Sequence, residues 1–528
     1  MVELTALDIA VMAVYFVSIL ALGFWVGRGE RDALDYFLAA RNLPWYLIGF
    51  SFYASNMSGA SFVGLMGAAY QHGMVVFNYE WTATLVLIFF AVFMLPAFLR
   101  AKLFTVPEYL EVRFDRRSRW VYACLTILTL IFIDMAGAIY AGGIVMSTMF
   151  PGVALWQAGA AMAVLAGSYT LFGGLRSVVV TDALQAVLMI VGAALIFLLG
   201  LQEVGGWSVL MDELAAAQTT LIKPADDAFL PWPGIAGVVL LGFYYWTLNQ
   251  YFVQRALAAR SLEEGRKGAL FGGLLKLPNL FLMILPGMIA IVLLPGIENP
   301  DRVFPTLAAK LLPAGLTGLI LTALIAAIMS SLDSALNAAA SLITMDFIRP
   351  LRPDISGRKL LVVGRALTAL LILLAAVYAP LIERFGSLFQ YFQATLAYIV
   401  PPIVAIYLGG LFWQRMSGAG AFWGTIAGLA LGLTFYLLKE VTDMWATAGL
   451  PPVHFTYMAV VMFVFSFLVM TAVSWAGGVP SPLPRGVVFD RGDLWAEPRA
   501  KGRGWSLDYR VLAAGLALLM AGSILVFR

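Results

Sequence analysis

Charged side chains are scarce in this sequence. Lys, Arg, Asp and Glu make up 12% of its 528 residues, whereas 62% are hydrophobic, and the mean hydropathy is +0.90. A soluble protein of this length needs far more polar surface to face water. The composition therefore excludes a soluble protein, argues against a nucleic-acid partner, and predicts an all-α polytopic membrane protein.

Cysteine, histidine and nucleotide-binding motifs are also few or missing. The single cysteine, Cys124, excludes an internal disulfide framework, and the two histidines, His72 and His454, are too far apart in sequence to predict a metal cluster. No Walker-type loop occurs, which argues against transport driven by ATP. No nucleophile beside a base is visible, so we expect no enzyme. The first apolar run, Ala6–Val26, is too long for a cleavable signal peptide, and its positive charges follow it.

Long apolar runs dominate what is present, and their lengths predict about fourteen transmembrane helices. The expected spans, numbered 1 to 14 in this order, are 6–27, 44–70, 75–99, 120–148, 153–174, 178–202, 231–255, 268–296, 314–345, 360–382, 385–413, 418–438, 455–476 and 508–527. The acidic loop 203–230 is expected to hold a short surface helix. The polar loop 477–507 is expected to tether a peripheral last span.

The basic residues predict the orientation. If the N-terminus faces outward, 26 of the 33 Lys and Arg residues fall in inward loops, six fall outward, and Lys276 lies inside a span. The densest inward clusters are 113–119, 255–267, 349–365 and 485–510. This asymmetry follows the positive-inside rule. We therefore expect a multi-pass protein of the plasma (bacterial inner) membrane with both termini outside.

Two of the expected spans are interrupted by polar or small residues. Residues 51–62 read SFYASNMSGASF, with Gly59 near the centre, and span 7 reads VVLLGFYYWTLNQYFVQR, with Gly242 and Asn249 inside it. Small residues can simply pack helices together. However, paired breaks in two halves of a chain are typical of transporters that bind their ligands at the membrane midplane.

The two breaks also predict the domain organisation. The breaks lie in spans 2 and 7, which are five spans apart, so these two spans cross the membrane in opposite directions. Spans 2–6 and spans 7–11 can therefore form two inverted repeats. We expect a peripheral first helix in 1–43 and a transport core in 44–413, with repeats 44–202 and 231–413. The peripheral C-terminal helices then occupy 414–528.

Five ionisable residues lie inside the expected spans, where charge is costly and usually functional. They are Glu80, Asp134, Asp182, Lys276 and Asp333. Glu80 and Lys276 can bind a polar solute from opposite sides, or can form a salt bridge that only joins helices. For Asp134 a structural hydrogen bond is the favoured interpretation.

Span 9 carries a stripe of oxygen ligands. Ser330, Asp333, Ser334 and Asn337 are spaced i, i+3, i+4 and i+7, which places them on one face of a helix. Hydroxyl, carboxylate and carbonyl oxygens suit a small hard cation. Alternatively, the serine hydroxyls bond back to the preceding turn while the helix packs a neighbour. Asp182 can share this site, binding a cation or a proton, if the end of span 9 extends inward beyond the bilayer.

Several motifs together resemble the sodium:solute symporter family, and most of all its sodium/glucose branch. They are GGLRSVVVTDALQ, SSLDSALN ahead of TMDF, NYEW, YYWTLNQYFVQRALAARS and GLFW, and they occur in the family's order over nearly the whole chain. The resemblance implies a leucine-transporter-like core of ten helices, spans 2–11, with five-plus-five inverted repeats and broken helices.

The resemblance also implies ion sites. The family's shared sodium site would use backbone carbonyls of Ala54, Met57 and Ala327 and the hydroxyls of Ser330 and Ser331. A second sodium site of some members would use Asp182 and Ser334. Asp333 stands where those members have a hydroxyl, which favours a second cation or a proton without deciding between them.

The solute site is implied in the same way, with some departures. Sugar-transporting members use positions that match Glu80, Lys276 and Gln393, with an inner gate at Tyr245 and outer aromatic residues at Tyr79 and Phe389. Two polar positions of the bacterial galactose transporter are Ser61 and Gly242 here, and its QEYTG-like run reads QATLA. Ser61 is therefore expected to face a larger or differently substituted solute.

Together these observations predict a sodium-coupled symporter that imports a small polar solute, a sugar before others, by alternating access. The number of sodium ions, one or two, stays open. The alternatives are sodium symport of a non-sugar such as a sialic acid, inositol, an organic acid or an amino acid, and, in another class, a polytopic membrane enzyme or a channel.

Overall fold

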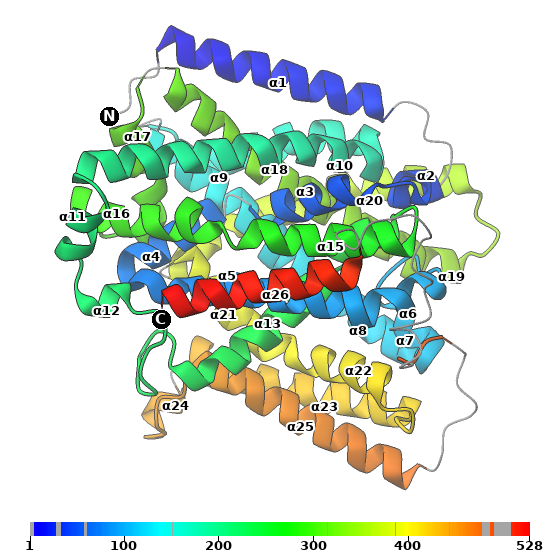
Figure 1. The fold of residues 1–528 in the computed structure, drawn as a ribbon. Helices are drawn as coiled ribbons and strands as arrows, with labels where there is room; N and C mark the ends of the chain where they lie inside the picture. Colours follow the sequence, from blue (N-terminus) through cyan, green and yellow to red (C-terminus); the bar gives the residue numbers. More distant parts are fainter. Residues whose placement is uncertain are drawn as a thin grey trace.

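A computed structural model describes residues 5–27, 33–57, 61–149, 152–313, 315–385, 387–442, 444–477, 486–489 and 508–527. Within these ranges the protein is helical, and β-structure is limited to two isolated bridges. Most of the long helices run side by side along one direction, and the two ends of the chain lie at the same end of this bundle (Figure 1). The prediction of an all-α membrane protein is confirmed.

The helices of the first part of the chain are α1 (Ala6–Val26), α2 (Ala33–Leu38), α3 (Trp45–Asn56), α4 (Met66–His72), α5 (Asn78–Phe89), α6 (Leu95–Arg100), α7 (Glu108–Arg113), α8 (Arg116–Thr129), α9 (Ala136–Met149), α10 (Leu155–Val204), α11 (Trp207–Glu213) and α12 (Ala216–Thr219). The remainder comprises α13 (Ile235–Thr247), α14 (Gln250–Leu257), α15 (Leu262–Lys276), α16 (Leu285–Leu293), α17 (Val303–Leu311), α18 (Leu316–Leu342), α19 (Arg349–Leu351), α20 (Gly357–Tyr378), α21 (Leu388–Ile399), α22 (Pro401–Phe412), α23 (Gly418–Tyr436), α24 (Met444–Thr447), α25 (Phe455–Ala476) and α26 (Tyr509–Val526). The short helices α11 and α12 are the surface helix expected between 203 and 230.

Ten helical stretches of the described chain are long and apolar enough to cross a membrane, and the bent pair α21–α22 makes an eleventh. Three further expected spans do not pass this test as single helices. Two of them are interrupted: α3 ends at Asn56, ahead of the stretch Ser61–Arg100 that contains α4, and α13 ends at Thr247, ahead of α14. The third is the first leg of α10, before Gly174. The breaks that the sequence predicted therefore appear as breaks in the helices themselves.

Helix α10 changes direction at one residue. Gly174 has φ 50° and ψ −172°, a conformation that only glycine adopts without strain, and it separates two legs of the helix. The second leg, Gly174–Val204, is long enough to span a membrane alone. It places Asp182 in the centre of the bundle beside α3 and α18.

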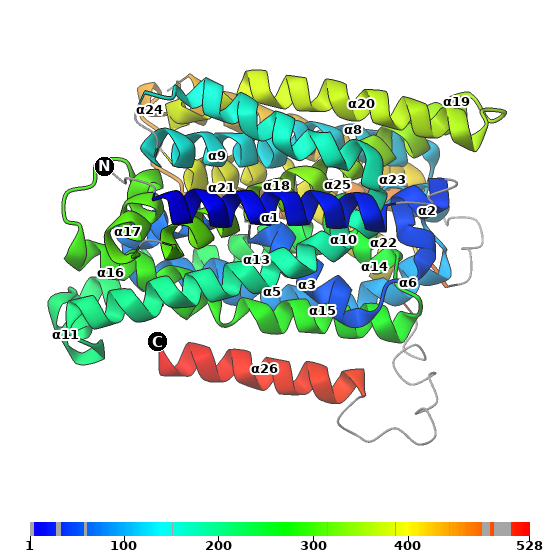
Figure 2. The same cartoon turned by 90° about the horizontal axis from the view of Figure 1, so that it is seen from above.

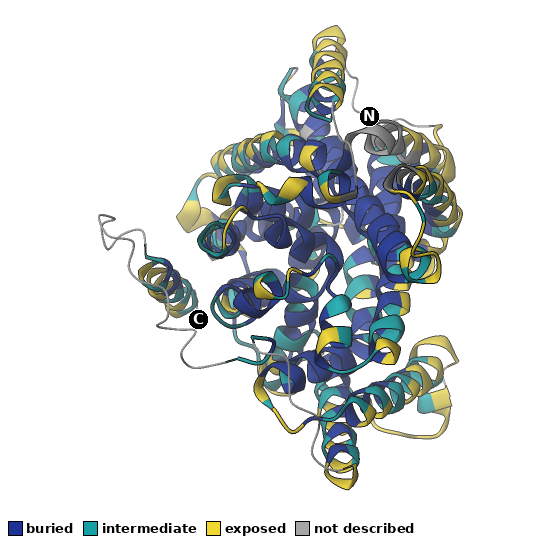
Figure 3. Ribbon diagram, turned by 90° about the vertical axis from the view of Figure 1, so that its right-hand side faces the viewer, coloured by how far each residue is buried: buried dark blue, intermediate teal, exposed yellow. Residues whose placement is uncertain are grey.

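Burial separates central helices from outer ones. In the most apolar window of the α18 stretch 94% of the residues are buried, against 11% for α1 and 17% for α26. Figure 1 shows α1 along one edge of the bundle, Figure 2 shows α26 outside the other helices, and Figure 3 shows the buried residues concentrated in the interior. Helices with so little burial in protein turn their apolar side chains to lipid.

Candidate functional site

The first helix break lies where the sequence places it. Helix α3 ends at Asn56, and Met57, with φ −73° and ψ 54°, leaves the helical path. Residues 58–60 lie outside the described part of the chain. A π-helical turn, η2 (Ser61–Leu65), then leads into α4, and the Ser61 hydroxyl donates a hydrogen bond back to the carbonyl of Asn56.

The second break separates α13 from α14. Thr247 ends α13, and Asn249 begins the next helix by accepting a hydrogen bond from the backbone N–H of Tyr251 at 3.4 Å. Helix α14 packs against α3, with the rings of Phe52 and Phe252 6.1 Å apart. The two interrupted helices therefore meet in the interior.

Helix α18 presents hydroxyl groups to the end of α3. The Ser331 hydroxyl donates to the carbonyl of Ser55 at 3.2 Å. Ala54 and Met57 lie in the same last turn and are completely buried. Ala327 lies one turn before Ser331 in α18. Ser331 thus joins α18 to the end of α3, where Ala54 and Met57 lie.

Ser330 faces a different partner. Its hydroxyl donates to a carboxylate oxygen of Asp182 at 2.5 Å. The other carboxylate oxygen of Asp182 accepts from Ser51 and, at 3.1 Å, from the guanidinium of Arg255. Asp182 and Arg255 are buried, with exposed side-chain fractions of 0% and 1%.

The guanidinium of Arg255 fills the space between three helices. It donates to Ser51 and Ser55 of α3, at 2.6 Å for Ser55, and to Ser334 of α18. Asp333, the neighbour of Ser334 in α18, is also buried. Asp182 and Ser334 are thus brought together around a side-chain cation.

This position of Arg255 corrects one expectation from the sequence. The charge pattern assigned Arg255 to an inward loop, but it lies in α14, in the protein interior. An arginine at a predicted span end can extend either into water or back into the bundle, and hydropathy does not distinguish the two. The carboxylate of Asp182 makes the buried position favourable because it pairs the charge.

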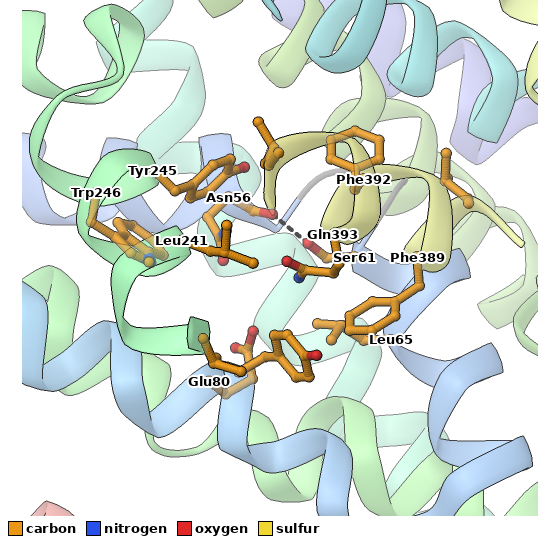
Figure 4. Close-up of a pocket in the computed structure, with 15 residues that line it drawn as sticks. Asn56, Ser61, Leu65, Glu80, Leu241, Tyr245, Trp246, Phe389, Phe392 and Gln393 are labelled. Atoms are coloured by element: carbon orange, nitrogen blue, oxygen red, sulfur yellow. Dashed lines mark hydrogen bonds between the residues drawn. The ribbon is translucent and has the colours of Figure 1, made fainter. Parts of the chain in front are cut away.

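A small cavity of about 110 Å³ lies beside the first break. Its polar lining includes Ser61, Glu80, Tyr245 and Gln393, all expected solute-site residues. Figure 4 shows Tyr245 and Trp246 on one side and Phe389 and Leu65 on the other, with Ser61 and Gln393 between them. The complete lining is Asn56, Ser61, Leu65, Tyr79, Glu80, Val238, Leu241, Gly242, Tyr245, Trp246, Leu388, Phe389, Phe392, Gln393 and Leu396.

Lys276 lies behind this cavity rather than in its wall. Its ammonium group forms an ion pair with Glu80, contacts the side-chain oxygen of Asn56, and lies 5.4 Å from the ring centre of Trp246. Asn279 donates to the same Glu80 oxygen at 2.5 Å. Glu80 is therefore the member of the pair that reaches the cavity, and its carboxylate is held by two donors.

An aromatic layer lies between this cavity and a second, larger one. The rings of Tyr79 and Phe389 meet edge to face with centres 4.9 Å apart, and Phe229 lies 6.1 Å from Phe389. Beyond this layer is a larger cavity of about 790 Å³, whose lining also includes Phe389, His72 and His454. The two expected outer gate residues thus stand between the two cavities.

Tyr245 closes the cavity on its other side. Its hydroxyl accepts a hydrogen bond from Tyr251 at 2.7 Å, and the Tyr251 hydroxyl lies 3.5 Å from Asp134. Asp134 therefore makes a hydrogen bond with Tyr251, which agrees with the structural hydrogen bond expected for it from the sequence. It also lies next to the tyrosine pair.

Four residues around these sites were not singled out from the sequence. The charge pattern places Arg255 in a loop, and Asn279 falls within the apolar span 268–296. Asn56 and Trp246 lie inside the two interrupted spans without an expected role. For Asn56 and Asn279 a signal exists, since an amide inside an apolar span is costly unless it has partners. Trp246 carries no such signal.

Comparison with known proteins agrees with this geometry. The profile of the family described as "Sodium:solute symporter family" matches residues 36–428. The chain is 34% identical to the sodium/glucose cotransporter 4 of Danio rerio, covering 89% of this chain and 79% of that one. It is 33% identical to the sodium/glucose cotransporter of Vibrio parahaemolyticus, covering 81% and 85%.

Among solved structures, a substrate-bound, outward-open Na⁺-coupled sialic acid symporter is similar, with a TM-score of 0.79 at 22% identity, covering 91% of this chain and 100% of that one. This likeness confirms the expected fold, a leucine-transporter-like core with inverted repeats and broken helices. Given the family match over most of the chain and relatives at more than 30% identity, the chain belongs to the sodium:solute symporter family and is a sodium-coupled symporter.

Proposed function

We propose that this protein imports a small, neutral polar solute, a sugar, together with sodium by alternating access. The observation that carries the proposal is the polar cavity between an aromatic layer and Tyr245, directly beside the contact of α3 with α18. The names of the sodium/glucose cotransporter relatives support a sugar. The cavity is smaller than ordinary ligand pockets of roughly 300–1,000 Å³, so solute entry must widen it.

In this proposal sodium binds at the end of α3. Carbonyls of Ala54, Met57 and Ala327 and the hydroxyls of Ser330 and Ser331 are its ligands. The contact of Ser331 with the last turn of α3 supports this assignment. A sodium ion there joins α3 to α18, favours the outward-open state and completes the solute pocket, and it leaves when the two helices separate.

We propose one sodium ion per cycle in the arrangement seen here. The second candidate set is Asp182, Asp333 and Ser334. The guanidinium of Arg255 already lies against Asp182 and Ser334, so a second cation or a proton would have to displace it. The positive charges of a second cation and of the Arg255 guanidinium would repel each other strongly at this short distance.

For the solute, we propose direct contacts with Ser61, Glu80 and Gln393, with Lys276 holding the Glu80 carboxylate. Tyr79 and Phe389 form the outer gate and Tyr245 the inner one. Glu80 is the one charged side chain among the residues described around the cavity. An anionic solute would therefore meet a carboxylate, which favours a neutral sugar or polyol over an organic acid.

The membrane arrangement is part of the proposal. We propose that both termini face outward in a bacterial inner membrane and that residues 44–413 form the transport core. The excess of basic residues in the opposite loops supports the orientation. Low burial of α1 and α26 supports a peripheral position for the first and last spans.

The test is uptake by the purified protein in proteoliposomes across a panel of sugars, inositol, sialic acid and amino acids, each with sodium, lithium or proton gradients. We expect sodium-driven uptake of a sugar. Ser331→Ala should raise the sodium concentration for half-maximal uptake about tenfold and change the solute KM by less than threefold. Ser523→Ala, at a half-buried position in the peripheral helix α26, is the matched control. Equal uptake with and without a sodium gradient would contradict sodium-coupled transport.

A further inference from the structure

Helix α21 carries residues of both the outer gate and the solute cavity, and its first turn needs partners. Phe389 lies in its first turn and Gln393 one turn later. The first four N–H groups of any helix have no partner within the helix. The side chain of Ser387 accepts from the N–H of Gln390 at 3.1 Å. The N–H of Leu388 instead turns to another part of the chain.

The acceptor for the Leu388 N–H is Asp301. Both carboxylate oxygens accept from the Leu388 N–H, at 3.1 and 3.3 Å. Asp301 belongs to the short 3₁₀ helix η8 (Pro300–Arg302) in the loop between α16 and α17, and it is 1% exposed. Its own N–H is fixed by the side chain of Asn299 at 2.9 Å, so the carboxylate is held in place from both ends.

The carboxylate also joins a third element. The hydroxyl of Tyr140, in α9, donates to it at 3.4 Å. Helix η8 packs closely on α4, since a Cβ atom at Gly67 would lie 2.5 Å from the carbonyl oxygen of Pro300. The loop therefore connects α4, which follows the first helix break, with α9 and with the start of α21.

We propose that Asp301 is a positioning residue for solute binding, a proposal that rests on the function proposed above. By holding the first turn of α21, it sets Phe389 against Tyr79 and aims Gln393 into the cavity. A negative charge at a helix N-terminus is favourable because it faces the positive end of the helix dipole.

The carboxylate has this charge at neutral pH. Burial raises the pKa of Asp301 to about 6, while the hydrogen bonds from Leu388 and Tyr140 oppose that rise. Above this pH the group is an acceptor only, which matches the two donors that face it. The contact thus needs an acceptor oxygen at this position.

Two substitutions separate positioning from general stability. Asp301→Asn keeps an acceptor oxygen for the Leu388 N–H, whereas Asp301→Ala removes it. In uptake assays at pH 7.5 we expect Asp301→Ala to raise the solute KM about tenfold with sodium activation unchanged within twofold. For Asp301→Asn, both the solute KM and the sodium activation should stay within threefold of wild type. Glu298→Gln, an exposed acid three residues earlier, is the matched control.

A second measurement does not depend on transport. Hydrogen–deuterium exchange of the purified protein should be faster for a peptide that covers residues 387–395 in Asp301→Ala and unchanged in Asp301→Asn and Glu298→Gln. If Asp301→Ala does not accumulate, Asp301→Ser replaces it, because its hydroxyl is too short to reach Leu388.

The outcomes are distinct. Unchanged exchange and unchanged solute KM in Asp301→Ala would overturn the proposal, as would equal losses in Asp301→Ala and Asp301→Asn. A loss of thermal stability in which solute and sodium constants move together would show a merely structural role. If wild-type uptake ignores the sodium gradient and Gln393→Ala leaves the KM unchanged, the proposed function fails while the exchange result still decides the role of Asp301.

Discussion

At the scale of single residues, the interior of this protein holds one arginine and one aspartate in a shared network. Arg255 and Asp182 bond to each other and to serines of α3 and α18. Burying either charge alone costs several kcal/mol, so the pair persists only because each residue has the other. The network lies next to the proposed sodium ligands and joins α14 to α3 and α18, the two helices that hold those ligands in the proposal.

Charge compensation in this pair can be tested with single and double variants. Asp182→Asn and Arg255→Gln should each destabilise the protein by roughly 3–5 kcal/mol, because each leaves a buried charge without its partner. The double variant should be more stable than either single one. The measurement is the thermal unfolding temperature in detergent. Arg260→Gln, which breaks a pair with Glu264 at the surface, serves as control and should leave the unfolding temperature nearly unchanged, because water screens that pair. A double variant less stable than both singles contradicts the pairing.

At the scale of secondary-structure elements, the breaks within helices, rather than the lengths of the helices, bring the polar groups of the candidate sites together. The breaks after Asn56 and at Leu248–Asn249 bring polar backbone and side chains into the interior. The break at Gly174 turns α10 so that its second leg brings Asp182 to the same place. Backbone without helical hydrogen bonds at membrane depth is tolerated where protein or a ligand satisfies it.

The Gly174 break gives a prediction for this scale. Gly174→Ala puts a Cβ atom on a residue with φ 50° and ψ −172°, which costs roughly 1–3 kcal/mol. We expect a lower unfolding temperature and reduced uptake, because the leg that carries Asp182 is displaced. Gly522→Ala, in α26 with open space around the added Cβ, should be neutral or slightly stabilising. An unchanged unfolding temperature in Gly174→Ala would show that the turn does not need glycine.

At the scale of the whole molecule, the proposed sodium site and the proposed solute cavity share one segment. Asn56 ends the helix whose carbonyls we propose as sodium ligands, and it also lines the cavity together with Ser61. An ion that fixes the end of α3 therefore also fixes part of the solute pocket. This shared segment is a physical basis for coupling between the two ligands.

Coupling of this kind must be reciprocal. If sodium tightens solute binding by some factor, solute must tighten sodium binding by the same factor, typically 5- to 150-fold. Equilibrium binding of labelled solute at several sodium concentrations, and of sodium at several solute concentrations, measures both factors in the purified protein. Ser331→Ala should reduce the two factors together. Two factors that both equal one would contradict coupling through this segment, and agreement between them checks that both measurements reached equilibrium.

The sequence alone determined the class of protein, the approximate spans and the places where helices break. Hydropathy reports transfer into lipid, which depends on composition, and small or amide residues weaken a helix wherever it lies. The family motifs also identified Ser61, Glu80, Tyr245 and Gln393, which the fold gathers around one cavity.

Only the tertiary structure decided which side chains meet. The helical period places Ser330 and Ser334 on one stripe of α18, but their contacts with Asp182 and Arg255 depend on how α10 and α14 pack against that stripe. Lys276 proved to stand behind Glu80, and Asp301 to hold the start of α21 from a loop 87 residues away. The physical reason is that spacing along a helix fixes the direction of a side chain relative to its own axis, whereas its partner depends on how other helices pack around that axis.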